Sequence, residues 1–325
     1  MLAEERSVVS GCHWLCVDLD DAADSLDNNW SWTQGRIGLP NTVIVGLSQH
    51  SSDDPILTNS PLLPWVDLIV TRDLPQDMVT KAAANLRQKP QASTGLIQLL
   101  RQGSAISVHQ GLLMESLMYS TLQHGAEFES WLNRRDSSAA AVDAGPSTRI
   151  QRENDCLTIT LNRPDKHNAF SATMRDELCQ ALYLAQTDSS IGQIVLKGQG
   201  PSFCAGGDLE EFGSARDASL AHLSRTTRSP ASLMAALAAR TTAQLHGACI
   251  GAGIELTAFA GRVVAREDTT FALPEVSFGL VPGAGGTVSI PRRIGRHRAG
   301  LLALSGHPID AALALEWGLI DRLAG

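Results

Sequence analysis

The sequence predicts an α/β protein in which strands alternate with helices and ligands bind at the strand ends. Two observations support this fold class. Short apolar runs alternate with amphipathic stretches along the second half of the chain. Three glycine-rich turns lie near predicted strands, at 203–209, 247–256 and 281–287. Glycine at such places lets backbone N–H groups approach a ligand closely.

The first part of the chain, residues 1–135, is predicted to contain two buried strands and then helices. The strands are expected at 41–48 and 65–71. Apolar residues at helical spacing mark two later stretches, which we interpret as core or subunit interface. The stripes are formed by Met78, Val79, Ala82, Ala83 and Leu86, and by Met114, Leu117, Met118, Tyr119 and Leu122, continued by Phe128, Trp131 and Leu132.

Residues 136–149 are predicted to be a linker. The stretch DSSAAAVDAGPST is small, polar and aperiodic, and it contains a Gly-Pro break. It separates residues 1–135 from a core at 150–325.

The core alternates more regularly between strands and helices. Strands are predicted at 156–162, 191–198 and 241–249, with further extended pieces at 262–268 and 269–273. Helices are predicted at 171–186, from about 229 to 239, and at 251–261. Ser171 is the expected N-cap of the first helix, a Ser-Pro pair opens the second, and Gly261 suits the end of the third.

Composition excludes several classes of protein. The net charge of −8, with acids and bases mixed, argues against general nucleic-acid binding. No apolar run is long enough to span a bilayer, and the acidic start lacks a signal-peptide core, so we expect a cytoplasmic protein. Six scattered cysteines include no second close pair to complete a zinc site, and we expect reduced thiols and no metal.

The glycine turns do not match the familiar nucleotide motifs. No lysine follows any of them as a phosphate-binding loop requires, and the dinucleotide fingerprint fails because Leu256 stands where its third glycine should be. A Gly-x-Ser-x-Gly nucleophile elbow is also missing. Two interpretations remain open: tight structural turns, or two turns that each offer a backbone N–H to an oxygen that becomes negative during a reaction.

Two glutamates favour the catalytic interpretation. Glu255 follows the second glycine turn, and Glu275 stands among apolar residues before the third. A single such glutamate is usually a cap or an ion-pair partner, and burying one is costly. Two carboxyl groups near one oxyanion site can instead divide into an acid and a base.

These residues occur in motifs that resemble the crotonase (enoyl-CoA hydratase/isomerase) superfamily over residues 150–323. Five motifs follow in order: LNRPDKHNAF, GPSFCAGGDLEEF, LHGACIGAGIEL, FALPEVSFGLVPGAGGT and LSGHPIDAALALEWGLIDRL. The resemblance implies a β/α spiral core that assembles as a homotrimer or a dimer of trimers. It also implies an acyl-CoA substrate, without a permanently bound cofactor, and a place in fatty acid metabolism.

The resemblance assigns a role to each candidate site residue. The amides of Gly207 and Ala252 would form the oxyanion hole for the thioester oxygen, although glycine is more usual at the second position. Glu255 and Glu275 would hold the attacking water, and Glu275 would protonate Cα. The resemblance places CoA against Lys166, His167, Asn168, Ala169, Ala205 and Asp208. Asp208 is also expected to cap the following helix.

The pair of glutamates favours hydration of a 2-enoyl-CoA. Family members with other reactions remain alternatives: an isomerase, a thioester hydrolase or a cofactor-free oxygenase of an aryl-acetyl-CoA. A non-catalytic scaffold paralogue is a further alternative, which the acidic balance and the retained pair disfavour. The basic cluster at 291–298 either attracts CoA phosphates or forms a solvated helix face.

The chain order departs from the family pattern. The resemblance implies cover helices after the final GLIDRL motif, and the segment 66–135 is similar to that missing part. We therefore expect residues 1–135 to be an abbreviated, non-catalytic crotonase-like half, or a helical domain for cover or assembly.

Overall fold

The computed structural model describes residues 6–20, 40–103, 105–135 and 145–324, so most of the predicted linker lies outside the described residues. Within these ranges, none of the helices combines the length and apolar character needed to cross a bilayer.

The largest sheet has six strands in the order β12-β9-β7-β6-β5-β4, and only the β4–β5 pair is antiparallel. Alternate residues of β5 face the core because strand side chains alternate between faces: Leu157, Ile159 and Leu161 are buried. The strands are β4 (Thr148–Glu153), β5 (Cys156–Leu161), β6 (Gln193–Gly198), β7 (Thr241–Leu245), β9 (Arg262–Ala265) and β12 (Arg322–Leu323).

The prediction of one strand over residues 241–249 is wrong, because two strands lie there. After β7 the chain turns and enters a second sheet of β8 (Ala248–Ile250), β10 (Thr270–Ala272) and β11 (Ile309–Asp310). Gly247 makes this turn with φ +55°, and a Cβ there would lie 2.1 Å from the carbonyl oxygen of Pro201. A glycine that is needed for a close approach therefore ends one strand and starts the next.

Two predicted helix starts in the core are confirmed. Ser171 caps α7 (Ala172–Thr187) by accepting from the amide of Met174, and Ser229 caps α9 (Pro230–Ala236) by accepting from Ser232. The other core helices are α8 (Ala218–Thr227), α10 (Ala252–Thr257), α11 (Gly286–Ser305) and α12 (Ala311–Trp317).

The prediction that Gly261 ends the helix after the second glycine turn is wrong, because α10 already ends at Thr257. Gly261 serves a close approach instead. Its amide donates to the carbonyl oxygen of Ala238 at 2.9 Å, and a Cβ at this position would lie 2.5 Å from the same oxygen.

The N-terminal part forms a small parallel sheet with helices. Strands β2 (Val43–Leu47) and β3 (Leu68–Val70) confirm the two predicted strands, and β1 (Trp14–Asp18) adds a third that the sequence analysis missed. The helices are α2 (Pro55–Thr58), α3 (Gln76–Gln88), α4 (Pro90–Gln102), α5 (Val108–Gln123) and α6 (Ala126–Leu132).

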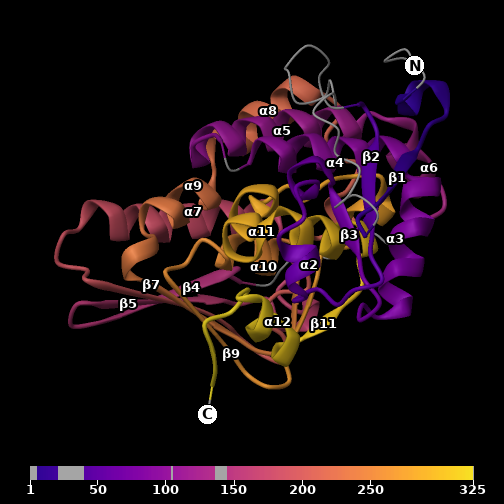
Figure 1. The fold of residues 1–325 in the computed structure, drawn as a ribbon. Helices are drawn as coiled ribbons and strands as arrows, with labels where there is room; N and C mark the ends of the chain where they lie inside the picture. The colour runs from indigo at the N-terminus through magenta and orange to yellow at the C-terminus, as the bar shows by residue number, and fades with distance from the viewer. Residues whose placement is uncertain (1–5, 21–39, 104, 136–144, 325) are drawn as a thin grey trace.

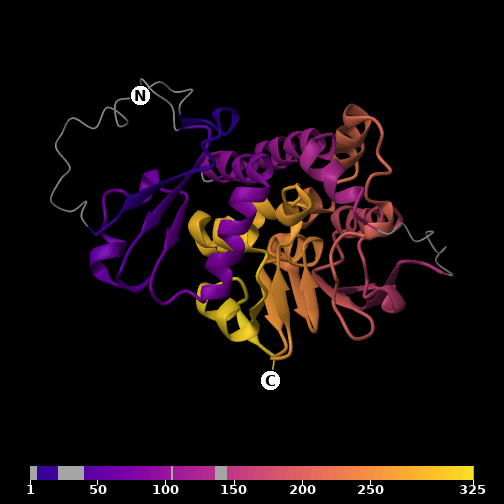
Figure 2. The ribbon, with the colours of Figure 1, turned by 90° about the vertical axis from the view of Figure 1, so that its right-hand side faces the viewer.

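Helix α11 joins the two parts of the chain. Its two ends, 286–290 and 299–305, are buried, and it packs against α3, α4 and α5 of the N-terminal part and against α10 of the core. Figures 1 and 2 show α11 in yellow between the purple N-terminal elements and the orange strands of the core. The N-terminal helices therefore lie directly on the core. The division into a cover domain, a linker and a catalytic domain stays a prediction.

The two helical stripes have different surroundings. On α3, Met78, Ala82 and Leu86 are buried as expected. On α5, Leu117 is 50% exposed in the single chain, so it is not a core residue, and a role in a subunit interface stays a prediction. The buried face of α5 is largely polar because it borders a cavity.

Candidate active site

A cavity of about 680 Å³ lies between the glycine turns of the core and helices α5 and α8. It brings together all four residues that the sequence analysis assigned to catalysis: Gly207, Ala252, Glu255 and Glu275 line its wall. Their convergence follows from the way the turns are joined.

The first two glycine turns lie side by side. The amide of Cys204 donates to the carbonyl oxygen of Ala248 at 3.0 Å, and the amide of Ile250 donates to Cys204 at 2.9 Å. Each turn then presents one amide at the cavity. Among the described residues, neither Gly207 nor Ala252 donates its backbone N–H to a protein acceptor. These two N–H groups are suited to bind an acceptor atom in the cavity.

Gly251 lets a carboxyl group approach the second turn. Its amide donates to Ala272 at 2.9 Å, which ties the turn to β10 and to the segment leading to Glu275. Its φ is +49°, and a Cβ there would lie 2.4 Å from Oε1 of Glu275. Only glycine fits this position without displacing the carboxyl group.

Glu275 is 8% exposed and begins the short helix η7 (Glu275–Phe278). Its Oε2 atom is buried and has no hydrogen-bond partner within the described part of the chain. Burial raises the pKa of Glu275 to about 8, and the charge of Glu115 acts in the same direction. Burial thus favours the protonated form of this carboxyl group, which is able to donate a proton.

Glu255 is buried and held more firmly than Glu275. Its Oε2 accepts from the amides of Ala284 at 2.7 Å and Gly286 at 2.9 Å, at the start of α11. Burial and then the charge of Glu275 raise the pKa of Glu255 well above its ordinary value, whereas the two amides lower it. The helix N-terminus also favours a negative charge at this carboxyl group.

The sequence analysis missed a third buried carboxyl group, that of Glu115 on α5. Its oxygens accept from the amides of Gly285 at 2.7 Å and Thr287 at 2.9 Å, and from the Thr287 hydroxyl at 2.6 Å. Burial raises the pKa of Glu115 to about 7 against these bonds. One feature of the sequence could have indicated Glu115: it is the one acidic residue in the predicted helical stretch 108–123.

Glu115 and Glu255 therefore hold the same turn. Successive amides from Ala284 to Thr287 donate alternately to Glu255 and to Glu115. A residue of the N-terminal part thereby fixes the loop that orients a core glutamate.

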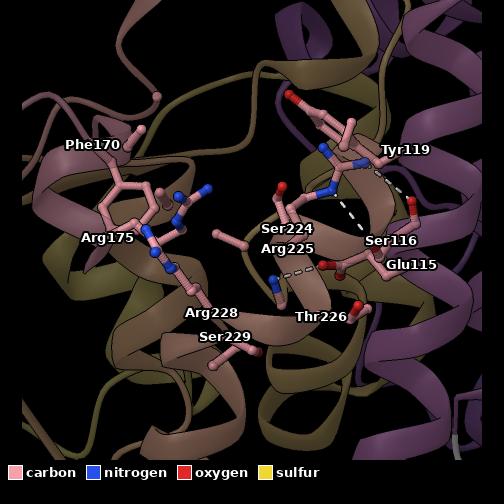
Figure 3. A pocket seen from close by; sticks show the side chains of 18 of the residues that line it. Glu115, Ser116, Tyr119, Phe170, Arg175, Ser224, Arg225, Thr226, Arg228 and Ser229 are labelled. Carbon is pink, nitrogen blue, oxygen red and sulfur yellow. Dashed lines mark hydrogen bonds between the residues drawn. The ribbon is translucent and has the colours of Figure 1, made fainter. Parts of the chain in front are cut away.

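The wall opposite the glycine turns contains further polar residues that the sequence analysis did not assign. Figure 3 shows Glu115, Ser116 and Tyr119 on one side of the cavity, with Arg225 of α8 beside them, and Phe170, Arg175 and Arg228 on the other. The Arg225 guanidinium lies over the Tyr119 ring at 4.8 Å from its centroid. Burial raises the pKa of Tyr119, so its phenol stays protonated.

The residues expected to contact CoA lie next to the first turn, and their roles stay predictions. The carbonyl oxygen of His167 accepts from the Ala205 amide at 2.9 Å, and Ala205 is exposed. Lys166 pairs with Glu210 at 2.6 Å. The Asn168 side chain is fully buried, accepts from the Arg163 amide of its own loop and donates to the carbonyl oxygens of Gln199 and Ser202 after β6. Phe170, which follows Ala169, reaches the cavity.

Asp208 has a structural role in addition to its place on the cavity wall. Its side chain accepts from the Glu210 amide and so caps the short helix η5 (Leu209–Glu211), as expected. Its other oxygen pairs with the buried Arg163 at 2.8 Å.

The buried thiols near the turns do not have the properties of nucleophiles. Burial raises the pKa of Cys204 to about 12 and that of Cys249 well above its ordinary value. Both groups are therefore thiols at neutral pH, whereas the thiolate is the reactive form.

The family model for enoyl-CoA hydratase/isomerase matches residues 151–324. The chain belongs to this family. Among its relatives, it is 36% identical over 172 residues to the 2,3-dehydroadipyl-CoA hydratase of Escherichia coli, an alignment that covers 53% of this chain and 67% of the relative. It is 34% identical to the mevalonyl-coenzyme A hydratase of Aspergillus fumigatus, covering 51% and 62%. The chain thus spans about two thirds of the length of these relatives.

Solved structures confirm the predicted crotonase-like fold. An enoyl-CoA hydratase subunit from Geobacillus kaustophilus superposes with a TM-score of 0.51 at 30% identity, over 55% of this chain and 68% of that one. AtuE from Pseudomonas aeruginosa superposes with a TM-score of 0.50 at 33% identity, over 55% and 70%. The family match begins at residue 151, so Glu115 and Tyr119 lie outside it and the glycine turns and Glu pair lie inside it.

Proposed function

We propose that this enoyl-CoA hydratase/isomerase family member adds water to the double bond of a 2-enoyl-CoA. One observation carries the proposal: two buried glutamates, one with an oxygen that has no partner among the described residues, line the same cavity as two residues whose backbone amides are free of protein acceptors in that part of the chain. Two relatives named as hydratases of CoA thioesters support it.

In the proposed reaction, the amides of Gly207 and Ala252 form an oxyanion hole for the thioester oxygen. Removing one such donor typically lowers the rate by about 10²–10³. Glu255 takes a proton from water as the water oxygen bonds to C3, and the electrons of the double bond move toward the thioester oxygen. Glu275 then gives its proton to C2, and the carbonyl re-forms. Proton transfer from Glu255 to Glu275 restores the starting state.

The assignment of base and acid rests on how each carboxyl group is held. Two buried carboxyl groups that interact strongly share one proton over a wide pH range. The charge belongs on Glu255, because two amides at the start of α11 bond its Oε2. The proton belongs on Glu275, whose Oε2 lacks such donors in the described ranges.

The substrate and assembly follow as parts of this proposal. CoA would lie along Lys166, His167, Asn168, Ala169, Ala205 and Asp208, as the family resemblance implies. No bound cofactor takes part. A homotrimer or dimer of trimers, a cytoplasmic location and a role in fatty acid metabolism stay predictions, and the sedimentation mass tests the first of them.

The absorbance of the conjugated enoyl thioester tests the proposed function. The parent should consume it with 2-enoyl-CoAs of short, medium or aryl acyl chains. Glu255→Gln and Glu275→Gln should each lower kcat by about 10²–10⁴, the usual contribution of a general acid or base. Glu267→Gln, which changes an exposed glutamate outside the cavity, is the matched control. Full activity in either cavity variant would make the role assignment wrong.

A second candidate is isomerisation on the same fold. The chain is 34% identical to the 1,2-epoxyphenylacetyl-CoA isomerase of Escherichia coli. The same pair of carboxyl groups would then move a proton between two carbons without adding water.

A further inference from the structure

We propose that the acyl end of the cavity accepts chains that end in a negatively charged group, with Arg225 as the counter-ion. The substrate class would be the 2-enoyl-CoA half-thioesters of dicarboxylic acids. The inference deepens the proposed function and rests on its assignment of the cavity to an acyl-CoA.

The direction of a bound acyl-CoA in the cavity places its acyl terminus near Arg225. A thioester bound at Gly207 and Ala252 extends in two directions, toward CoA and toward the acyl terminus. The proposed CoA segment leads into Phe170 on one side of the cavity. The other side is the wall between α5 and α8, where Ser116, Tyr119 and Arg225 lie (Figure 3). The acyl chain therefore points to Arg225.

Arg225 differs from the other three cavity arginines in its partners or its burial. Arg175 and Arg228 both pair with Asp176, and Arg216 is exposed whereas Arg225 is half-buried. Arg225 donates to neutral acceptors: at 3.3 Å to Ser116 Oγ, the Ser116 carbonyl and Gln123 Oε1, and also to Ser120 Oγ. In the described ranges, no carboxylate lies within 4.0 Å of it.

Glu115 is the carboxyl group that acts electrostatically on Arg225, but its hydrogen bonds go to other residues. Its oxygens bond to Gly285 and Thr287. Glu115 offsets part of the Arg225 charge through space, but no carboxylate bonds to this half-buried guanidinium in the described ranges, and a cation without a bonded counter-ion is costly in a low-dielectric site. A carboxylate on the substrate would balance it. Four of the five N–H groups of the guanidinium bond to protein acceptors, and the remaining N–H of Nη1 is the donor for one charge-assisted bond to a carboxylate oxygen.

A purely structural role for Arg225 is the competing explanation, since its bonds also tie α8 to α5. Binding of saturated acyl-CoAs separates the two roles, because saturated thioesters cannot be hydrated. The probes are pairs of equal chain length: glutaryl- and pentanoyl-CoA, adipyl- and hexanoyl-CoA, suberyl- and octanoyl-CoA. Calorimetry with the parent, Arg225→Met and Arg225→Lys gives each Kd. Arg266→Met, which removes an exposed arginine outside the cavity, is the matched control.

We expect the parent to bind at least one carboxylate-ended probe about tenfold or more tightly than its methyl-ended partner, as a charge-assisted pair allows. Arg225→Met should abolish this preference but leave the methyl-ended Kd within about threefold of the parent's. Arg225→Lys should keep part of the preference, and Arg266→Met all of it.

Equal binding of both members in every pair by the parent would overturn the proposal. So would an equal loss in Arg225→Met for adipyl-CoA, hexanoyl-CoA and CoA itself, since Arg225 would then contact the CoA phosphates. A preserved binding preference in a protein that hydrates no 2-enoyl-CoA would leave this inference standing and reject only the hydratase proposal.

Discussion

Glu275 and Glu255 border the same cavity, yet their carboxyl oxygens differ in their hydrogen-bond partners. Two amides fix an oxygen of Glu255 at the start of α11. An oxygen of Glu275 is buried without a partner in the described part of the chain. One carboxyl group is thereby suited to carry charge and the other to carry a proton, which is the difference that an acid–base pair requires.

This difference predicts the pH dependence of activity. Glu275 must hold a proton in order to donate it, and its pKa of about 8 lies above the ordinary value. The group is therefore competent below about pH 8 and loses its proton as the pH rises through that value. We expect kcat/KM to fall above about pH 8, about tenfold per pH unit once the group is ionised.

A pH–rate profile with a 2-enoyl-CoA checks this expectation. The Glu267→Gln control should show the same alkaline limb as the parent. A rate that stays constant well above pH 8 would show that Glu275 does not donate the proton.

Sequence analysis identified Glu255 and Glu275 but missed Glu115. Glu255 and Glu275 stand beside glycine turns in the sequence, so local pattern indicated them. Glu115 is 170 residues away from the amide of Gly285 that it binds. Nothing in a helical stripe of Met and Leu shows that its polar face borders a cavity.

At the scale of elements, helix α6 packs against two segments of the cavity wall, the one that holds Gly207 and the one that begins at Glu275. Phe128 is 1% exposed, and its ring stacks on Trp131 at 5.7 Å. Trp131 in turn contacts Phe278 at 4.7 Å and Phe212 at 5.9 Å between ring centroids. Phe278 belongs to η7, which begins at Glu275, and a Cβ on Gly207 would meet the Phe212 ring at 2.8 Å.

We therefore expect Phe128→Ala to lower stability and activity together. Loss of a fully buried phenylalanine costs about 3–5 kcal/mol in the free energy of unfolding. Tyr183→Ala, which changes a 53% exposed aromatic residue, should cost less than about 1 kcal/mol. Thermal unfolding and turnover of the two variants give the comparison. Parent-like unfolding of Phe128→Ala would exclude α6 as a support of the turns.

Helix starts that depend on residues nearby in the sequence were predictable. Strand and helix ends that depend on contacts between residues distant in the sequence were not. Ser171 and Ser229 start helices by accepting from amides three residues ahead, which a sequence pattern records. Gly247 divides a predicted strand because its backbone passes close to Pro201, a neighbour only in the folded chain. The prediction that Gly261 ends a helix was wrong for the same reason, because its close approach to Ala238 exists only in the folded chain.

At the scale of the whole molecule, the N-terminal part and the core are joined by hydrogen bonds from helix α11. Arg296 and His297 of α11 donate to the carbonyl oxygens of Leu63, Pro64 and Val66. The sequence analysis weighed the basic cluster as a phosphate attractor or a solvated face, but these two residues bond to the protein itself. Their acceptors lie more than 200 residues away in the chain, so charge pattern alone did not indicate them.

The fold class and the Glu pair could be predicted because five ordered motifs encode them within residues 150–323. The complete cavity could not, because α5 comes from the other end of the chain and lies outside the family match. Helices α5 and α6 lie over the turns that hold Gly207 and Glu275. An origin of the N-terminal part as an abbreviated crotonase-like half stays a prediction.

The mass of the product formed from a 2-enoyl-CoA tests the hydratase proposal most directly. We predict that the intact thioester gains the mass of one water, with the new hydroxyl at C3, and that Glu275→Gln forms at least about 10²-fold less of it. An unchanged mass with a moved double bond would identify an isomerase. Release of free CoA, or no conversion of any 2-enoyl-CoA by the parent, would contradict the proposed reaction.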